Sequence, residues 1–187
     1  AVHDHNIVVG DINQGNLLVD RQMCVRFIDC DSFQICDQDK VYRYMVGTPH
    51  LTPPELQSTQ FAKVTRTKQN DCFGLAVLIF HLLFVGRHPF AGRYRGSGDL
   101  SIEQAIQGKH FAFSTAKDAT LMDPPPASLA LADIPASLAE LFELAFCGDP
   151  RGNEPRPTAW EWVSELDNLL KHRKSCQFDD SHTYYRK

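Results

Sequence analysis

The sequence lacks any hydrophobic run long enough to cross a bilayer. Its longest apolar run, residues 75–85, is interrupted by His81 and is about half as long as a membrane-spanning helix. No secretory signal pattern is present at the amino terminus. Basic charge is also scarce, since 19 Lys and Arg against 23 Asp and Glu give a net charge of −4. We therefore expect no membrane contact and no general electrostatic binding to nucleic acid.

Disulfide patterns are missing as well. Six cysteines in 187 residues fall short of a disulfide scaffold, and no two of them form a C-x-x-C pair. We expect mostly buried thiols in a reducing, cytoplasmic setting. What the sequence does contain is ordinary for a soluble protein: 43% hydrophobic and 22% charged residues. The length fits one domain with a sizeable core.

Short apolar runs predict the first elements. Residues 7–9 resemble a strand entering a core, with no start signal before them. The chain is therefore expected to begin inside a larger domain. Residues 17–19 and 25–28, separated by a polar turn, predict a β-hairpin.

A long loop and a buried helix come next. Residues 31–43 are polar and irregular, and residues 47–54 are rich in helix and strand breakers, so a loop is predicted as far as Glu55. Residues 71–85 are apolar almost all round, which predicts a helix that is buried on most of its surface and is ended by Gly86.

Helices also dominate the remainder. A short helix is expected to open at Ser101, whereas residues 111–135, rich in proline and alanine, predict an extended and weakly structured connection. Residues 136–146 predict an amphipathic helix. The last helix has Thr158 as its cap and Glu161 three positions on, which is a capping box. A small β-hairpin followed by helices makes the predicted fold mainly α.

Three polar residues near the start of the chain need a chemical reason. Asp11, Asn16 and Asp29 sit among apolar runs, at the ends of predicted strands. Burying such groups without a partner is costly, so they are candidates for function. The alternative is that Asp11 and Asn16 cap turns and Asp29 only ends a strand.

Six motifs in order resemble one known family. The chain is similar to the carboxyl-terminal lobe (C-lobe) of the eukaryotic-type protein kinase fold. The matching residues are Asp11 with Asn16 five positions on, Asp29 at a strand end, Gly47-Thr48 with Pro53-Pro54-Glu55, Asp71 to Ala76, Gly86 to Phe90, and Arg156-Pro157-Thr158.

The resemblance divides the chain into a kinase C-lobe and a tail, with a small β-hairpin carrying the catalytic and metal-binding loops. The implied parts are a C-lobe over residues 1–173, a catalytic loop 9–16, an activation segment 29–55, a central helix 71–85, a last helix 158–171, and a tail 174–187.

Phosphoryl transfer explains the polar residues. It needs an aimed acceptor hydroxyl and cations that neutralise phosphate oxygens, and Mg²⁺ prefers oxygen ligands. The resemblance implies that Asp11 is the catalytic base and that Asn16 and Asp29 bind Mg²⁺ for ATP. Thr48, before the closing Pro-Pro-Glu, favours serine or threonine as the acceptor in a protein substrate.

The departures from the family matter as much as the matches. Val9-Gly10 replaces the usual His-Arg before the catalytic aspartate, so the arginine that gathers a phosphorylated activation loop is absent. Asn13 stands at the catalytic-loop position of a lysine, which removes one stabilising charge. Asp31 replaces the glycine after the metal-binding aspartate.

Three further matches are structural in kinases. Glu55 and Arg156 match a buried ion pair, and removing one partner of such a pair costs about 3–5 kcal/mol. Asp71 is expected to cap the central helix and to hold the backbone of the catalytic loop.

The catalytic-loop sequence narrows the resemblance to a bacterial subgroup of kinase-like proteins. Some members carry a zinc ribbon or helix-hairpin-helix segment after the kinase lobe, and some are associated with a von Willebrand A-type protein and a PP2C-type phosphatase. Cys176 and His182 resemble the first half of a zinc motif. A zinc site needs four ligands, and the alternative is a frayed tail.

No glycine-rich loop, strand lysine or helix glutamate of a kinase amino-terminal lobe (N-lobe) occurs in the sequence. With the N-lobe absent, this chain alone is expected to be inactive, and its own N-lobe or a partner would have to cover the open face. Two functions remain open at this point. One is an atypical serine/threonine kinase, and the other is a pseudokinase that organises a signalling complex.

Overall fold

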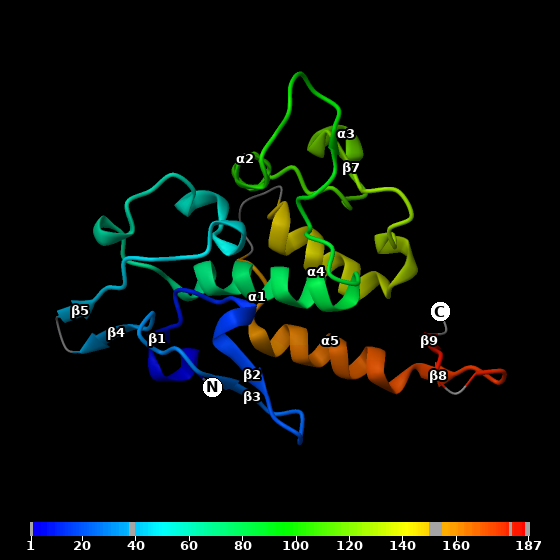
Figure 1. Cartoon of the computed structure of the whole chain (residues 1–187), viewed down its shortest axis with the longest axis horizontal. Coiled ribbons are helices and arrows are strands. Elements are labelled where there is room, and N and C mark those ends of the chain that lie inside the picture. The colour runs from blue at the N-terminus through cyan, green and yellow to red at the C-terminus, as the bar shows by residue number, and fades with distance from the viewer. Residues whose placement is uncertain (1, 38–39, 150–154, 180, 186–187) are drawn as a thin grey trace.

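The computed structural model describes residues 2–37, 40–149, 155–179 and 181–185. Figure 1 shows one long helix, α1, crossing the middle of the molecule, with α4 and α5 nearby. The small sheets formed by β1 to β5 lie on the side of the molecule where the amino terminus is found. The architecture is built from helices and small sheets, in agreement with the kinase-like fold that the resemblance implies.

The amino-terminal part forms a small antiparallel sheet. After the 3₁₀ turn His3–His5, strand β1 (Ile7–Val8) pairs with β4 (Gln34–Asp37), which pairs with β5 (Lys40–Tyr42). The prediction that residues 31–43 are irregular was therefore wrong. The partner of β4 lies far along the chain in β1, and local polarity gives no sign of such a pairing.

The predicted β-hairpin is confirmed. Strands β2 (Leu17–Val19) and β3 (Val25–Phe27) pair antiparallel, with Leu17 opposite Phe27. The short 3₁₀ turn Gln14–Asn16 leads directly into β2. The activation segment then continues through two more 3₁₀ turns, Pro49–Leu51 and Pro54–Leu56, and Phe61–Lys63 follows as a third.

Helix α1 spans Lys68–Leu83 rather than residues 71–85. It begins earlier because Asn70 Oδ1 accepts hydrogen bonds from the Thr67 backbone N–H (2.7 Å) and hydroxyl (3.1 Å). Beyond its end, Gly86 adopts a left-handed backbone with φ +77, which favours glycine. Phe73, Ala76, Val77 and Phe80 are fully buried along α1.

The core is rich in aromatic rings. Phe80 on α1 stacks on Phe84 with ring centroids 4.0 Å apart. Helices α4 (Ala136–Phe146) and α5 (Ala159–Lys171) complete the packing, with Phe142 and Trp162 4.8 Å apart. The predicted helix 136–146 and the Thr158–Glu161 capping box are confirmed. Thr158 is the cap, and the helix itself begins one residue later than predicted.

Residues 111–135 are more ordered than predicted. Phe111, Ala112 and Phe113 are buried, and the Phe111 ring lies 5.8 Å from that of Phe80. These apolar side chains fill the space beside α1, which the proline and alanine content did not indicate. Short elements around them are α2 (Ile102–Gln107), α3 (Lys117–Thr120), the paired strands β6 (Arg93–Tyr94) and β7 (Met122–Asp123), and the 3₁₀ turn Leu131–Asp133.

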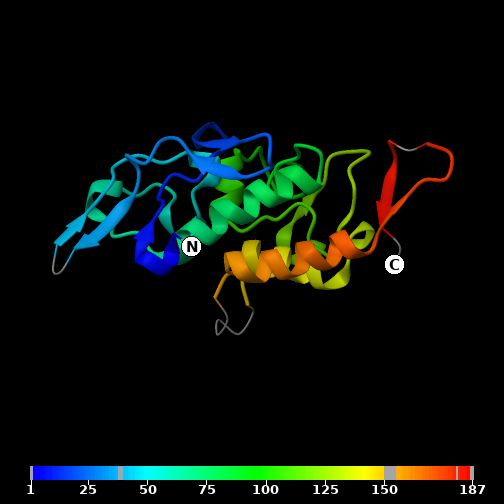
Figure 2. The same ribbon diagram turned by 90° about the horizontal axis from the view of Figure 1, so that it is seen from below.

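The tail forms a hairpin. Strands β8 (Arg173–Ser175) and β9 (Thr183–Tyr185) pair antiparallel beyond the end of α5, and both views place them away from β1 to β5 (Figures 1 and 2). The frayed-tail alternative is therefore wrong for the described residues. Within the described part of the chain, the helices are too short or too polar to cross a membrane.

Candidate active site

The carboxylate of Asp71, on helix α1, binds the backbone of the predicted catalytic loop 9–16. Asp71 is 3% exposed and accepts hydrogen bonds from the backbone N–H of Val9 (2.7 Å) and of Gly10 (2.9 Å). The expectation that Asp71 holds the loop backbone is confirmed. The expectation that it caps the helix was wrong, because Thr67 occupies the cap position.

Asp11 contacts the activation segment through one oxygen. Its Oδ1 accepts a hydrogen bond from the backbone N–H of Thr48 and another from the Thr48 hydroxyl, both at 2.9 Å. These two donors hold one oxygen of the carboxylate in place. The loop and the activation segment are therefore joined at the residue predicted to be the base.

Asn13 contacts the other oxygen of Asp11. Its Nδ2 donates to Asp11 Oδ2 at 3.0 Å, and its Oδ1 accepts from the backbone N–H of Gly15 at 2.8 Å. The amide thus links the base to the next turn of the loop. It orients Asp11 without supplying a positive charge.

Asn16 and Asp29 lie at the same end of the β2–β3 hairpin. Asn16 Nδ2 donates to the backbone carbonyl of Asp11 at 3.1 Å, and no described residue donates to its Oδ1. The backbone N–H of Ile28, next to Asp29, donates to the carbonyl of Asn16 at 3.1 Å. An amide oxygen and an exposed carboxylate fit the preference of Mg²⁺ for oxygen ligands. Their role as ligands stays a prediction.

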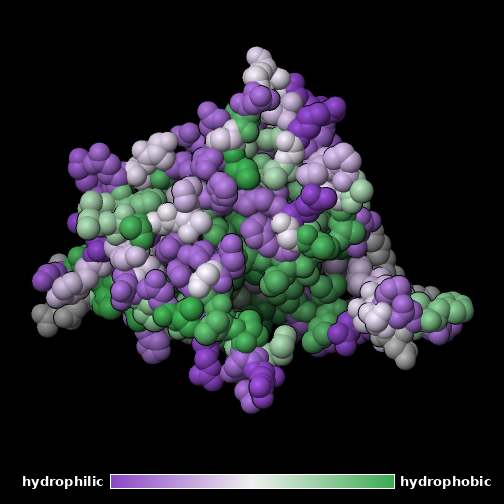
Figure 3. All heavy atoms as spheres, viewed as in Figure 1, coloured by the Kyte–Doolittle hydropathy of each residue, from purple (hydrophilic) through white to green (hydrophobic). Residues whose placement is uncertain are grey.

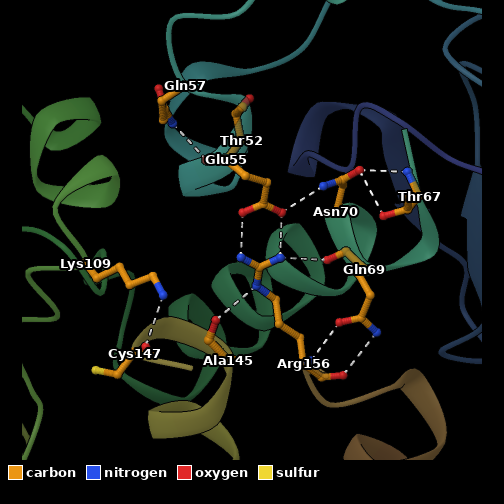
Figure 4. Close-up of polar contacts among 10 residues, drawn as sticks. All are labelled: Thr52, Glu55, Gln57, Thr67, Gln69, Asn70, Lys109, Ala145, Cys147 and Arg156. Atoms are coloured by element: carbon orange, nitrogen blue, oxygen red, sulfur yellow. Dashed lines mark hydrogen bonds and ion pairs between the residues drawn. The ribbon is translucent and has the colours of Figure 1, made fainter. Parts of the chain in front are cut away.

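The Glu55–Arg156 ion pair forms as predicted, but it is not fully buried. Two parallel bonds of 2.7 Å join the guanidinium to the carboxylate, as Figure 4 shows, and the Glu55 side chain is 45% exposed. Burial raises the pKa of Glu55, but the hydrogen bonds and charge of Arg156 outweigh it and leave the pKa below its ordinary value. Asn70 adds a third bond at 2.8 Å. The pair joins the end of the activation segment to the start of the last helix.

Sequence reasoning missed Arg66, which touches this region. Arg66 is 5% exposed, and its guanidinium donates to the backbone carbonyls of Gly10 and Val46. It lies outside the family motifs, between two threonines in a polar stretch. The only local signal is a charged residue shortly before a buried helix.

The cysteines differ from expectation. Cys24, Cys30 and Cys36 are exposed and Cys72 is buried, so the prediction of mostly buried thiols was wrong. All six cysteines are free. Burial raises the pKa of the Cys72 thiol to about 11, which makes this cysteine unreactive at neutral pH.

The predicted zinc ligands lie in the tail hairpin, away from Asp11. The backbone N–H of Cys176 donates to the carbonyl of His182 at 2.9 Å, so the two residues face each other. His182 Nε2 lies 3.3 Å from Asp179 Oδ2. Among the described residues, no group of three or more His, Cys, Asp and Glu side chains has the geometry of a metal site.

Comparison with known proteins gives one clear result. The family model described as a protein kinase domain matches residues 1–165. The chain is 40% identical over 189 residues to a protein named Protein kinase YegI from Escherichia coli (strain K12), a match that covers 98% of this chain and 28% of that protein.

More distant relatives cover a shorter stretch. Serine/threonine-protein kinase N2 of Danio rerio is 35% identical over 91 residues, which is 49% of this chain and 9% of that kinase. Serine/threonine-protein kinase PLK4 of Drosophila melanogaster is 34% identical over 93 residues, 48% of this chain and 11% of the relative. The chain spans less than a third of the length of these curated relatives.

Proposed function

The chain belongs to the protein kinase family, and from this we propose that it is the C-lobe of an atypical bacterial serine/threonine kinase. The kinase transfers the γ-phosphoryl group of ATP to hydroxyl groups of a protein substrate with Mg²⁺. One observation carries the proposal: both oxygens of the Asp11 carboxylate are held, by Thr48 and by Asn13, beside Asn16.

Asp11 acts as the base in this reaction. The acceptor oxygen forms a bond to the γ-phosphorus as the bond from that phosphorus to the β–γ bridging oxygen breaks, ADP leaves, and the hydroxyl proton passes to Asp11. Held by three hydrogen bonds, the carboxylate keeps one orientation toward the acceptor. Asn16 and Asp29 would hold Mg²⁺, which would supply positive charge to the phosphate oxygens.

Thr48 supports a serine or threonine acceptor. It belongs to the activation segment, and its hydroxyl contacts the proposed base directly. Any rearrangement of the segment around Thr48 changes the orientation of Asp11. The contact between Thr48 and Asp11 would therefore connect the binding of substrate at the activation segment to the orientation of the base.

The face around the hairpin is proposed to be covered by the N-lobe or by a partner protein. Leu18, Val25 and Ile28 are all more than half exposed on β2–β3 and beside them. In Figure 3 hydrophobic side chains gather in the region where Figure 1 places this hairpin and α1. Exposed apolar surface of this kind favours association. We propose that the chain in isolation does not catalyse phosphoryl transfer. We also propose that the kinase works in the cytoplasm.

A binding module is the second candidate. Asn13 offers a neutral amide at the position of a lysine, which favours a pseudokinase that organises a signalling complex with a phosphatase or a von Willebrand A-type protein. The retention of Asp11, Asn16 and Asp29 together favours the enzyme, because a scaffold has no need for that set.

The experiment compares radiolabel transfer by the full-length protein and by its Asp29→Ala variant, with ATP and Mg²⁺. Asp167→Ala is the matched control, since Asp167 is an exposed aspartate on α5. Asp29→Ala is expected to lower labelling by about 100-fold or more, because a metal ion at this site is worth several kcal/mol. Asp167→Ala is expected to label like the parent. Equal labelling by parent and Asp29→Ala, or none by either, would contradict the enzyme proposal and favour the binding module.

A further inference from the structure

A buried arginine lies beneath the contact between the catalytic loop and the activation segment. The backbone of Arg66 is fixed by Gln34 of β4, which is 2% exposed. The Arg66 N–H donates to Gln34 Oε1 at 2.9 Å, and Gln34 Nε2 donates to the Arg66 carbonyl at 2.8 Å. The small sheet thus sets the position from which the Arg66 side chain extends.

The guanidinium of Arg66 bridges two chain segments. Its Nη1 donates to the carbonyl of Gly10, the residue before Asp11, and its Nη2 donates to the carbonyl of Val46, two residues before Thr48. A planar guanidinium presents donors in a fixed fork, so it holds two carbonyls in a defined relation. This is a second link between segments that Asp11 and Thr48 already join.

Burial of this charge is costly, and several neighbours compensate. The pKa of Arg66 lies below its ordinary value, because burial lowers it by more than the charges of Asp11 and Asp71 raise it. The Phe61 ring lies under the guanidinium, 4.4 Å from its central carbon. Arg66 Nε is buried without a hydrogen-bond partner in the described part of the chain. In the described part of the chain, the hydrogen bonds of this buried guanidinium are those to the carbonyls of Gly10 and Val46.

Two glycines leave room for the guanidinium. A Cβ at Gly10, which has φ +81, would lie 2.6 Å from the Ser32 carbonyl oxygen and 2.9 Å from Arg66 Nη1. A Cβ at Gly47 would lie 3.1 Å from Arg66 Nη2. The sequence therefore lacks side chains at both points where Arg66 enters. One of these two positions is Gly10, directly before Asp11, where the kinase family usually has arginine.

We propose that Arg66 is a positioning residue that locks the activation segment onto the catalytic loop without phosphorylation of that segment. The charge that links the two segments comes from Arg66, which follows the activation segment in the chain, instead of from residue 10. The catalytic consequence rests on the proposed kinase function, whereas the link between the segments can be measured by itself.

The test uses hydrogen exchange and kinetics on the full-length protein after phosphatase treatment. The variants are Arg66→Met, which removes the fork, and Arg66→Lys, which keeps a cation without the fork. Arg43→Met is the matched control, because Arg43 is an exposed arginine of the activation segment whose Nε donates to Thr65 Oγ1 at 3.1 Å. Exchange is followed in peptides covering residues 43–52 and, as a core reference, residues 136–146.

Arg66→Met is expected to speed exchange in residues 43–52 by about tenfold or more, because charge-assisted hydrogen bonds are lost, and to leave 136–146 unchanged. Arg66→Lys is expected to speed exchange in residues 43–52 by a smaller factor. Arg43→Met is expected to leave exchange in residues 43–52 unchanged. In the kinase assay, Arg66→Met is expected to lower kcat by about tenfold or more with KM for ATP kept, because the base loses its alignment.

Three results with the variants would overturn the proposal. These are unchanged exchange in 43–52 for Arg66→Met, equal loosening of 136–146, and behaviour of Arg66→Lys identical to the parent. Loss of protection in the parent on phosphatase treatment would also overturn it. If the parent has no kinase activity but the exchange pattern holds, the function proposed above fails and the link made by Arg66 stands.

Discussion

Thr48 donates two hydrogen bonds to Oδ1 of Asp11, one from its backbone N–H and one from its hydroxyl, each at 2.9 Å. This double contact joins a residue of the activation segment to the proposed base, 37 positions earlier in the chain. The orientation of the proposed base therefore depends on Thr48, which sequence reasoning places in a separate loop, as well as on Asn13.

The first prediction concerns the base. Asp11→Asn is expected to lower kcat by about 10²- to 10⁴-fold, because the amide cannot accept the proton of the acceptor hydroxyl. The fold is expected to be kept, because the amide oxygen still accepts from Thr48 and only the bond from Asn13 is lost. Phosphorylation kinetics of the full-length protein check the rate, and a urea unfolding curve that matches the parent checks the fold. Parent-like turnover would show that Asp11 is not the base.

The second prediction separates the hydroxyl of Thr48 from its backbone. Thr48→Val removes one of the two bonds to Asp11 and is expected to lower kcat by about tenfold, because a hydrogen bond to a charged group is worth about 1.5–3 kcal/mol. Thr48→Ser keeps the hydroxyl and is expected to stay within a few-fold of the parent. Initial rates at saturating ATP make the comparison. Equal rates for both variants would mean that the hydroxyl contact has no part in catalysis.

The third prediction concerns stability. Asp71→Ala leaves the N–H groups of Val9 and Gly10 without their acceptor and is expected to lower the free energy of unfolding by about 3 kcal/mol. His3 loses a 2.9 Å contact to the same carboxylate. Urea unfolding measures the change. The exposed-site control Asp167→Ala is expected to remain within about 0.5 kcal/mol of the parent, and a similar small effect of Asp71→Ala would contradict the role given to this residue.

The fourth prediction is a pH dependence. The pKa of Glu55 is held below its ordinary value of 4.5 in the folded protein, where Arg156 outweighs burial. The carboxylate therefore stabilises the fold fully above that ordinary value, and its contribution is lost as the pH falls through the lowered pKa. Glu55→Gln is expected to cost about 1 kcal/mol at neutral pH, a modest amount because the side chain is 45% exposed.

Unfolding curves of parent and Glu55→Gln, recorded from pH 7 downward, check this expectation. The difference in unfolding free energy should shrink in acid and in high salt, which screens the pair. Glu140→Gln on α4 is the control, because Glu140 is exposed. A difference that stays constant over the whole pH range would contradict the assignment to the Glu55 charge.

The fifth prediction concerns the tail. If Cys176 and His182 supply half of a zinc site, full-length protein is expected to hold zinc that Cys176→Ser and His182→Ala lose. Cys24→Ser serves as the control, since Cys24 is also a free cysteine and is exposed. Elemental analysis of the purified proteins gives the answer. Zinc content that is zero in the parent, or unchanged in the variants, would remove both residues from the metal chemistry.

Elements with local signals were predicted well from the sequence. The hairpin of β2 and β3, helix α4 and the capping box of α5 depend on side-chain periodicity and on contacts within about four residues, which the sequence displays directly. The family motifs likewise put Asp11 and Asn16 in one loop, because their short spacing is fixed by the chain itself, whereas their roles as base and metal ligand stay predictions. The bond from Asn16 to the Asp11 carbonyl agrees with this.

Features with distant partners were missed. The pairing of β1 with β4 and the burial of Phe111 beside α1 each depend on atoms far away in the sequence. Polarity made residues 31–43 look irregular, although residues 34–37 and 40–42 pair as strands. Proline made residues 111–135 look weakly structured, although Phe111, Ala112 and Phe113 are buried in the core.

The sequence by itself determined the residue types of the site and their order, since the chemistry of carboxylates and amides belongs to the residues. Only the tertiary structure decided how they are held. Arg66 reaches Gly10 and Val46 across 56 and 20 positions, and no local pattern encodes such contacts. The reason is physical: a buried cation is tolerated only where the folded chain brings acceptors to it, and those acceptors are backbone carbonyls that every residue carries.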